Sequence, residues 1–169
     1  MIEFRGQVSP ILLFYMVQKN QIKEIISNLI DGTELFIVDI IIRPGNGISV
    51  LVDSIKGVTI DEIATLSKSI DSILDRDAED FELEVSSPGL SHPFKVSQQY
   101  YKNIGRDIEI LSNNGQKYIG KLLSVNSDDF TVEIQNKIKP VGRKKPEMVT
   151  TQQQFKYDEV KSTKIVINF

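Results

Sequence analysis

The stretch that decides the organisation of this chain is Glu82-Leu83-Glu84-Val85-Ser86-Ser87-Pro88-Gly89-Leu90-Ser91-His92-Pro93-Phe94. Its first part alternates acidic and apolar residues, which is the pattern of a β-strand with one buried face. Pro88-Gly89 then ends the strand, and His92-Pro93 keeps the chain extended, because proline restricts its own backbone and that of the preceding residue. We therefore predict a stiff inter-domain joint over residues 88–96, with a joint motif made of Ser86, Ser87, Pro88, Gly89, Leu90, His92 and Pro93.

The charge of the chain changes sign across this joint. The 169 residues carry a net charge of −3, but residues 1–86 carry −8 and residues 87–169 carry +5. An acidic half joined to a basic half indicates that the second half faces a polyanion. We predict an α/β domain over residues 17–87 and a second domain over residues 97–169. A core of that size gives only a few kcal/mol of net stability.

Upstream of the joint, the apolar spacing predicts two helices and three strands. The helices span residues 17–31 and about 60–75, the second opened by a capping box of Thr59 and Glu62. The strands span residues 35–42, 48–52 and 80–86, and an Asn46-Gly47 turn joins the first two. An α-β-β-α-β unit of this kind forms a small sheet covered on one side by two helices. The order is KH-like, but the G-x-x-G loop of KH-type RNA-binding domains is missing and the acidic balance opposes direct RNA contact.

The N-terminus precedes this pattern. We expect residues 1–16 to be an N-terminal extension, of which residues 1–15 lie outside the native protein and Met16 is the natural first residue. The apolar run from Ile11 to Val17 is too short to span a bilayer, and no small-x-small cleavage site follows it. The expected compartment is therefore the cytoplasm.

Downstream of the joint, short strand signals follow one another closely. A helical turn near Tyr100 precedes predicted strands at residues 107–111, 117–125, 130–134, 155–157 and 164–169. Five short strands with tight turns favour a small all-β barrel, so the expected fold class of the chain is α+β. Residues 136–154 contain two prolines, a glycine and a glutamine run, and we interpret them as a long mobile loop.

That loop is strongly basic. It places five cations within nine residues without an acid among them: Lys137, Lys139, Arg143, Lys144 and Lys145. Such a patch is suited to phosphates of an RNA backbone or to an acidic protein surface, since neutralised phosphates release condensed counterions. The alternative is a solvated charge run with no partner.

Catalytic, metal and cofactor sites are not predicted. The chain has no cysteine and one histidine, which argues against thiol chemistry and a transition-metal site. His92 lies near Ser86, Ser87 and Ser91, but no nucleophile elbow or third orienting group accompanies it. The acids between Asp75 and Asp80 lack the ligand spacing of a calcium loop and fit a solvated turn. Nucleotide-binding glycine motifs are absent from the sequence.

The joint resembles the signature of the RimP family of ribosome maturation factors. The resemblance rests on Glu84–Leu90, Pro93-Phe94 and Asn103-Ile104-Gly105-Arg106, and extends to Gly57–Glu62 and Gly120–Leu123. It implies a KH-like α/β module followed by a small Sm-like or SH3-like β-barrel. It also implies a cytoplasmic factor, without a cofactor or a reaction, that binds the immature small ribosomal subunit through ribosomal protein and rRNA.

The chain departs from the family at three places. Ser91-His92 stands where many members carry Asp-Arg, residues 136–154 look like an insertion, and the leader has no counterpart. We expect a monomeric, non-catalytic assembly factor for the small ribosomal subunit. Two alternatives remain: a general Sm-like RNA-binding module that acts on free RNA, and a hydrolase that uses His92.

Overall fold

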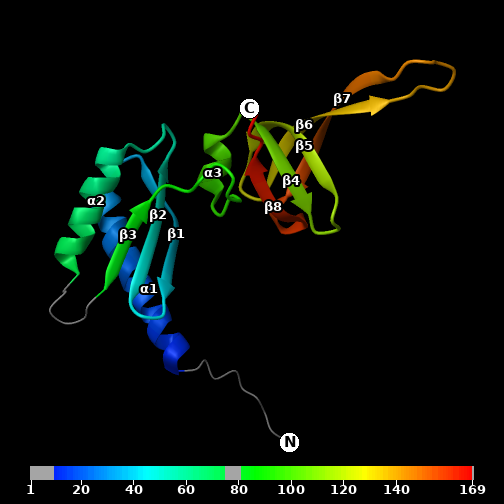
Figure 1. The fold of residues 1–169 in the computed structure, drawn as a ribbon. Coiled ribbons are helices and arrows are strands. Elements are labelled where there is room, and N and C mark those ends of the chain that lie inside the picture. The colour runs from blue at the N-terminus through cyan, green and yellow to red at the C-terminus, as the bar shows by residue number, and fades with distance from the viewer. Residues whose placement is uncertain (1–9, 75–80, 169) are drawn as a thin grey trace, which may run out of the picture. The chain divides into compact units, whose positions relative to one another are not determined.

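The computed structural model describes residues 10–74 and 81–168, with side chains from residue 18 onward. The described residues form an α+β protein with three α-helices and two sheets (Figure 1). The chain divides into two compact units, Met1–Pro88 and Gly89–Phe169. The α+β class predicted from the sequence is confirmed.

The first unit has the predicted α-β-β-α-β order. It consists of α1 (Pro10–Ile30), β1 (Leu35–Arg43), β2 (Gly47–Ser54), α2 (Ile60–Ile73) and β3 (Glu82–Ser86). β1 and β2 form an antiparallel hairpin, and β3 pairs with β2 in parallel. β2 is therefore the central strand of the sheet. The hairpin, the second helix and the strand before the joint were all predicted from periodicity.

Two local details of this unit differ from the prediction. α1 begins at Pro10 rather than at residue 17, because proline is tolerated in the first helical turn and no glycine or proline interrupts the following residues. The predicted extension over residues 1–16 thus shares residues 10–16 with α1, and its first nine residues lie outside the described part. In the hairpin turn, the left-handed residues are Gly45 (φ 88°) and Asn46 (φ 61°), one position before the predicted Asn-Gly pair.

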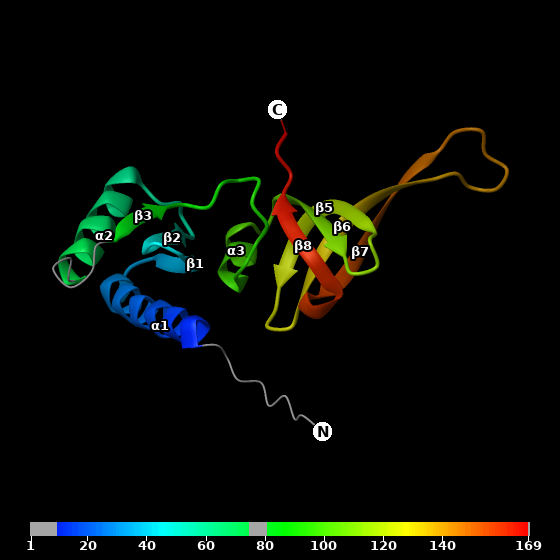
Figure 2. The same ribbon diagram turned by 60° about the horizontal axis from the view of Figure 1, so that its bottom comes forward.

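Both helices bury their apolar side chains against one face of the first sheet. Ile22 and Ile26 of α1 and Leu66 and Ile70 of α2 contribute to a single core with the strand residues Ile40, Ile48, Val50, Val52. Figure 2 shows α1 and α2 beside this sheet. The capping box is present: the hydroxyl of Thr59 accepts from the backbone N–H of Glu62, and the Glu62 carboxylate accepts from the Thr59 backbone N–H at 2.8 Å.

The second unit is built from one antiparallel sheet and a short helix. Its elements are α3 (Ser97–Lys102), β4 (Asp107–Ser112), β5 (Lys117–Val125), β6 (Asp129–Ile138), β7 (Glu147–Lys156), the 3₁₀ turn η1 (Tyr157–Glu159) and β8 (Val160–Ile165). The strand order is β7-β6-β5-β4-β8. Over residues 81–168, β7 and β8 are thus the edge strands, and the ladder does not close into the predicted barrel. An aromatic core of Tyr100, Phe130 and Phe155 lies beneath the sheet.

The largest correction concerns the predicted loop of residues 136–154. β6 and β7 pair continuously from Asp129 with Lys156 to Ile138 with Glu147, so only residues 139–146 connect them. Residues 135–150, here called the hairpin arm, project away from the rest of their sheet (Figure 1). The strand part of the arm buries neither face. It therefore lacks the apolar–polar alternation on which strand prediction depends.

Candidate nucleic-acid interface

The predicted joint motif lies at the boundary between the two units. Ser86 is the last residue of β3, and the boundary falls between Pro88 and Gly89. The backbone N–H of His92 donates to the carbonyl of Gly89 at 3.0 Å and closes a turn. A Cβ atom at position 89 would lie 2.8 Å from His92 Nδ1, so glycine is what lets the imidazole pack against the chain here.

Most of this motif is exposed. Ser87, Gly89, Leu90, His92 and Pro93 lie at the surface, and the Leu90 side chain is 60% exposed. No hydrogen bond joins the His92 ring to a serine hydroxyl within the described residues, so the grouping that a nucleophile and its base require is not formed there. An exposed leucine and an exposed imidazole on one turn offer contact surface for a partner.

The motif at residues 103–106 has a structural role. Asn103 is buried at the end of α3 and donates through Nδ2 to the carbonyl of Gln99 at 2.7 Å. Gly105 adopts φ 87° and donates its N–H to the Leu122 carbonyl at 2.7 Å. The Leu122 N–H in turn donates to the carbonyl of Arg106 at 2.9 Å. The motif therefore holds the start of β4 against β5, while the side chains of Ile104 and Arg106 stay exposed.

The five predicted cations gather at the end of the hairpin arm. Lys137 lies on β6, and Lys139, Arg143, Lys144 and Lys145 lie on the connection to β7. All five are exposed. Arg143 forms an ion pair with Glu147, and no ion pair is found for the four lysines in the described part of the chain. By contrast, Lys117 and Lys164 both approach the carboxylate of Glu109, at 3.6 and 3.4 Å.

Apolar side chains accompany these cations. Ile138 is 46% exposed and Met148 is 55% exposed, and Val141 is fully exposed on the connection. Lys137 and Met148 are directly opposite in the β6–β7 ladder, so they share one face of the arm. Ammonium groups without carboxylate partners can neutralise phosphates, and the apolar groups beside them can cover sugars, bases or an apolar protein surface.

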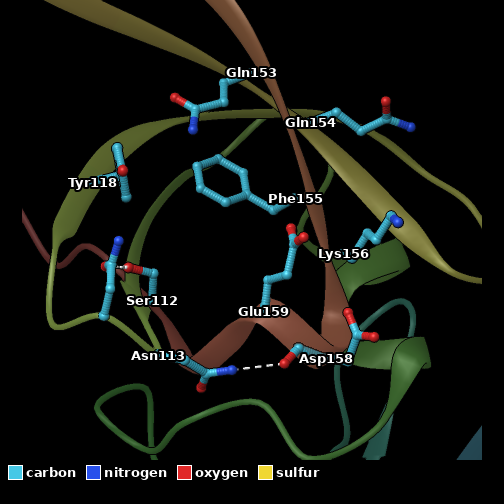
Figure 3. A pocket seen from close by; sticks show the side chains of 10 residues that line it. Ser112, Asn113, Tyr118, Gln153, Gln154, Phe155, Lys156, Asp158 and Glu159 are labelled. Atoms are coloured by element: carbon cyan, nitrogen blue, oxygen red, sulfur yellow. Dashed lines mark hydrogen bonds between the residues drawn. The ribbon is translucent and has the colours of Figure 1, made fainter.

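A cavity of about 470 Å³ opens at one end of the second sheet (Figure 3). The rings of Tyr118 and Phe155 meet edge to face there, with centroids 5.1 Å apart. The surrounding groups are mostly amides and charged side chains, namely Asn113, Asn114, Gln153, Gln154, Lys156, Asp158 and Glu159. Asn113 donates through Nδ2 to the carbonyl of Asp158 at 2.6 Å. One lysine against two carboxylates does not favour a polyanion.

Metal and membrane sites have no support in the described residues. Within residues 10–74 and 81–168, no group of three or more metal-ligating side chains is close enough to hold an ion. The acids Asp75, Asp77, Glu79 and Asp80 lie outside the described residues. Neither described stretch contains a helix that is long and apolar enough to cross a membrane.

Sequence patterns missed the strands of the arm and the cavity. The run Val149-Thr150-Thr151 is β-branched and could have predicted a strand, but the neighbouring glutamines and the exposed surroundings hid that signal. The cavity joins residues of β4, β5, β7 and η1 that are distant in the sequence. No local pattern predicts such a grouping.

Comparison with known proteins gives consistent matches. A family model described as the RimP N-terminal domain matches residues 22–91. A ribosome maturation factor RimP from Porphyromonas gingivalis is 43% identical over 134 residues, covering 78% of this chain and 88% of the relative. The RimP of Flavobacterium psychrophilum is 35% identical over 156 residues, covering 91% of this chain and all of the relative. The RimP of Christiangramia forsetii is 33% identical over 142 residues, covering 82% and 90%.

Proposed function

Because this chain belongs to the RimP family of ribosome maturation factors, we propose that it assists maturation of the small ribosomal subunit by binding the immature particle. It would contact both rRNA and a ribosomal protein, in the cytoplasm and as a monomer. The observation that carries the rRNA contact is the exposed cluster of lysines on the hairpin arm.

The arm is suited to reaching RNA across a rugged particle. It presents Lys137 on β6 and Lys139, Lys144 and Lys145 on the connection to β7, and it buries none of them. Contacts of ammonium groups with phosphates position a protein on RNA without reading its sequence. A factor that recognises a maturing particle by shape needs contacts of this kind.

The first unit would supply the protein contact. Acids exposed on this unit include Glu34 in the turn before β1, Asp61 and Glu62 on α2, and Glu82 on β3. Acidic surface repels RNA and favours the basic surface of a ribosomal protein. The joint, with Leu90 and His92 exposed, would add further contacts with the particle.

We also propose the finer fold relationships that the family resemblance implies. The first unit would be a KH-like module over residues 17–87, and the second an open form of an Sm-like barrel over residues 97–169, with the joint at 88–96. The α-β-β-α-β order and the five antiparallel strands support this assignment. The action would be non-catalytic, in keeping with the exposed, isolated position of His92.

A charge-reversal variant tests the rRNA contact. Arg143→Glu, Lys144→Glu and Lys145→Glu together should weaken co-sedimentation with immature small subunits, because three phosphate-binding cations are replaced by repelling carboxylates. The dependence of binding on salt should also become shallower, by about 0.7–0.9 in the logarithmic slope for each lost contact. The measurement is a sedimentation profile of ribosomal particles probed for this protein over a salt series.

A matched control distinguishes the effect of the cations' position on the arm from the effect of the protein's net charge. Lys23→Glu, Lys68→Glu and Lys121→Glu make the same change in net charge at three exposed positions away from the arm. This control should retain most of the binding. Equal co-sedimentation of the arm variant and the wild type would contradict the proposed rRNA contact.

The second candidate is a general Sm-like module that binds free RNA as a ring. It is favoured by one observation: β7 and β8 are edge strands, and ring assembly requires free edges. Light scattering distinguishes the two functions, since a mass near 19.1 kDa excludes a ring. Tight binding to free RNA by a larger assembly would favour the second candidate.

A further inference from the structure

The second unit holds another cavity, of about 320 Å³, where residues 94–97, at the end of the joint and the start of α3, pass β8 and η1. We infer that this cavity binds one nucleotide of a single-stranded RNA, with its base on the rings of Phe94 and Tyr157 and its phosphate beside Lys95 and Lys161. The volume lies at the small end of ligand pockets, about 300–1,000 Å³, and suits one nucleotide. The inference deepens the proposed RNA contact and rests on it.

Three rings form the apolar wall of this cavity. Tyr100 is buried at its base, 4.9 Å from Phe94 and 5.1 Å from Tyr157 between ring centroids. Both neighbours meet Tyr100 nearly edge to face, at 79° and 75°. Phe94 and Tyr157 are only half-buried. Part of each side chain is therefore accessible to a ligand, while Tyr100 packs against both rings and Phe130 also packs against Tyr157, with centroids 5.5 Å apart.

Hydrogen bonds restrict the side chains of Tyr100 and Tyr157. Tyr100 donates its hydroxyl to Thr163 Oγ1 at 2.9 Å, and Tyr157 donates its hydroxyl to the Asn126 carbonyl at 3.1 Å. The backbone N–H of Phe94 donates to the Thr163 carbonyl at 2.7 Å, which ties the end of the joint to β8. The rings are thus preorganised, so little side-chain entropy is lost when a base stacks on them.

The charged side chains of the wall are Lys95 and Lys161, and no carboxylate lines this cavity. Asp129, the first residue of β6, is absent from this lining and accepts a hydrogen bond from Asn126 Nδ2 at 2.7 Å. The cavity of Figure 3 differs, because its lining includes the carboxylates of Asp158 and Glu159 as well as Lys156. Both cavities belong to the second unit. Of the two, the cavity lined by Lys95 and Lys161 is the one with a positive rim suited to a phosphate.

Hydroxyl groups complete the polar part of the wall. Ser97, Ser127 and Ser162 line the cavity from α3, from the turn before β6 and from β8. A hydroxyl both donates and accepts, so it can bind a ribose or the edge of any base. Aromatic faces, hydroxyls and ammonium groups around one small cavity are the combination that binds single strands without a strict sequence preference.

Fluorescence anisotropy with a short labelled single-stranded oligouridine tests this site on the full-length chain. Lys161→Ala should weaken binding by about three- to tenfold at low salt and reduce the logarithmic salt slope by about 0.7, the value for one phosphate contact on a single strand. Tyr157→Ala should weaken binding by about five- to a hundredfold, whereas Tyr157→Phe should keep most of the affinity, because it keeps the ring and loses only the hydrogen bond to Asn126.

The matched control is Lys156→Ala, which removes a lysine one residue before Tyr157 that lines the other cavity. It should retain wild-type affinity. Thermal unfolding identifies variants that fail to fold, and Lys161→Ala changes an exposed side chain that the core does not need. Equal weakening by Lys156→Ala and Lys161→Ala, or wild-type binding by a folded Tyr157→Ala, would overturn the site.

Photo-crosslinking locates the base directly. An oligonucleotide that carries 4-thiouridine should crosslink to the tryptic peptide Tyr157–Lys161 or to the peptide that contains Phe94. Crosslinks confined to the hairpin arm would refute the pocket while leaving the proposed function intact. Failure of the proposed function would be recognised separately, because that function is tested by sedimentation with ribosomal particles and not by oligonucleotide binding.

Discussion

At the scale of single residues, Gly120 shows how closely β5 approaches β6. Gly120 pairs with Ile134, and a Cβ atom at position 120 would lie 2.3 Å from the Glu133 carbonyl oxygen and 2.7 Å from Val132 Cγ1. Neither neighbour can move freely, because one is backbone in a ladder and the other is a fully buried side chain. Glycine is needed here for space and not for backbone conformation.

The substitution Gly120→Ala should therefore lower the free energy of unfolding by about 3 kcal/mol, since the two strands must separate to admit the methyl group. Gly115→Ala is the matched control. Gly115 has φ 86° but open space around it, so alanine there should cost only about 1–2 kcal/mol of backbone strain. Urea denaturation of both variants measures the difference, and a smaller loss at position 120 than at position 115 would refute the packing explanation.

Because of Tyr157, the second unit should lose stability at alkaline pH. Burial of the ring raises the pKa of Tyr157 to about 12, and the nearby groups Tyr100, Tyr101 and Asp129 add to the rise. An unfolded tyrosine titrates near pH 10. The folded state therefore holds the proton more tightly, and the resulting stabilisation is complete below pH 10 and is lost as the pH rises through about 12.

Between those pH values, the wild type should lose stability more steeply than Tyr157→Phe, which has no ionisable group at this position. Urea unfolding at a series of pH values provides the slopes, and near-ultraviolet absorbance follows the titration itself. The slopes are compared rather than the absolute stabilities, because Tyr157→Phe also loses the hydrogen bond to Asn126. Parallel slopes for the two proteins would contradict the raised pKa.

At the scale of elements, α2 illustrates a helix that the local sequence specifies well. Its capping box and its apolar spacing were predicted from the sequence, and Leu66 and Ile70 are buried as expected. The hydrogen bonds from Thr59 lower the pKa of Glu62, so this carboxylate contributes to stability at neutral pH and ceases to do so as the pH falls through its folded pKa.

Removal of the cap by Thr59→Ala should lower the free energy of unfolding by about 1 kcal/mol. Thr65→Ala is the matched control, because Thr65 is exposed within the same helix and alanine is a better helix former. The control should be neutral or slightly stabilising in thermal unfolding. If both variants unfolded at the same temperature, the capping box would make no net contribution.

The hairpin arm, in contrast to α2, is an element that the local sequence specifies poorly. Its strands bury no side chain between Ile134 and Phe155, so its pairing depends on backbone hydrogen bonds and cross-strand neighbours. Such a ribbon contributes little to the stability of the sheet. The residues at its end are therefore free to be selected for binding, which is consistent with the gathering of lysines there.

At the scale of the whole molecule, each unit carries its own core. The core of the first unit contains Ile26 and Ile70, and the core of the second contains Leu122 and Phe130. Neither cluster of buried residues includes a residue of the other unit. The two units should therefore lose their structure separately.

Ile26→Ala and Leu122→Ala test this separation, since both remove a fully buried side chain. Each should cost about 3 kcal/mol in its own unit. Hydrogen exchange followed by mass spectrometry should show faster exchange in β1–β3 for Ile26→Ala and in β4–β6 for Leu122→Ala. Faster exchange throughout the chain in either variant would show that the units unfold as one.

The sequence by itself determined the α-β-β-α-β order, the capping box, the strands β4 and β5, and the family. These features are encoded locally, because apolar periodicity and turn residues report which face of an element is buried. The basic cluster was also visible in the sequence, since charge needs no folding to be counted.

Only the tertiary structure decided the parallel pairing of β3 with β2, the extension of β6 and β7 into an arm, and the two cavities of the second unit. Strand partners and cavities depend on contacts between residues far apart in the chain, which no local pattern records. The strands of the arm were not predicted because both of their faces are exposed to solvent. Without buried side chains, their sequence lacks the alternation of apolar and polar residues that indicates a strand.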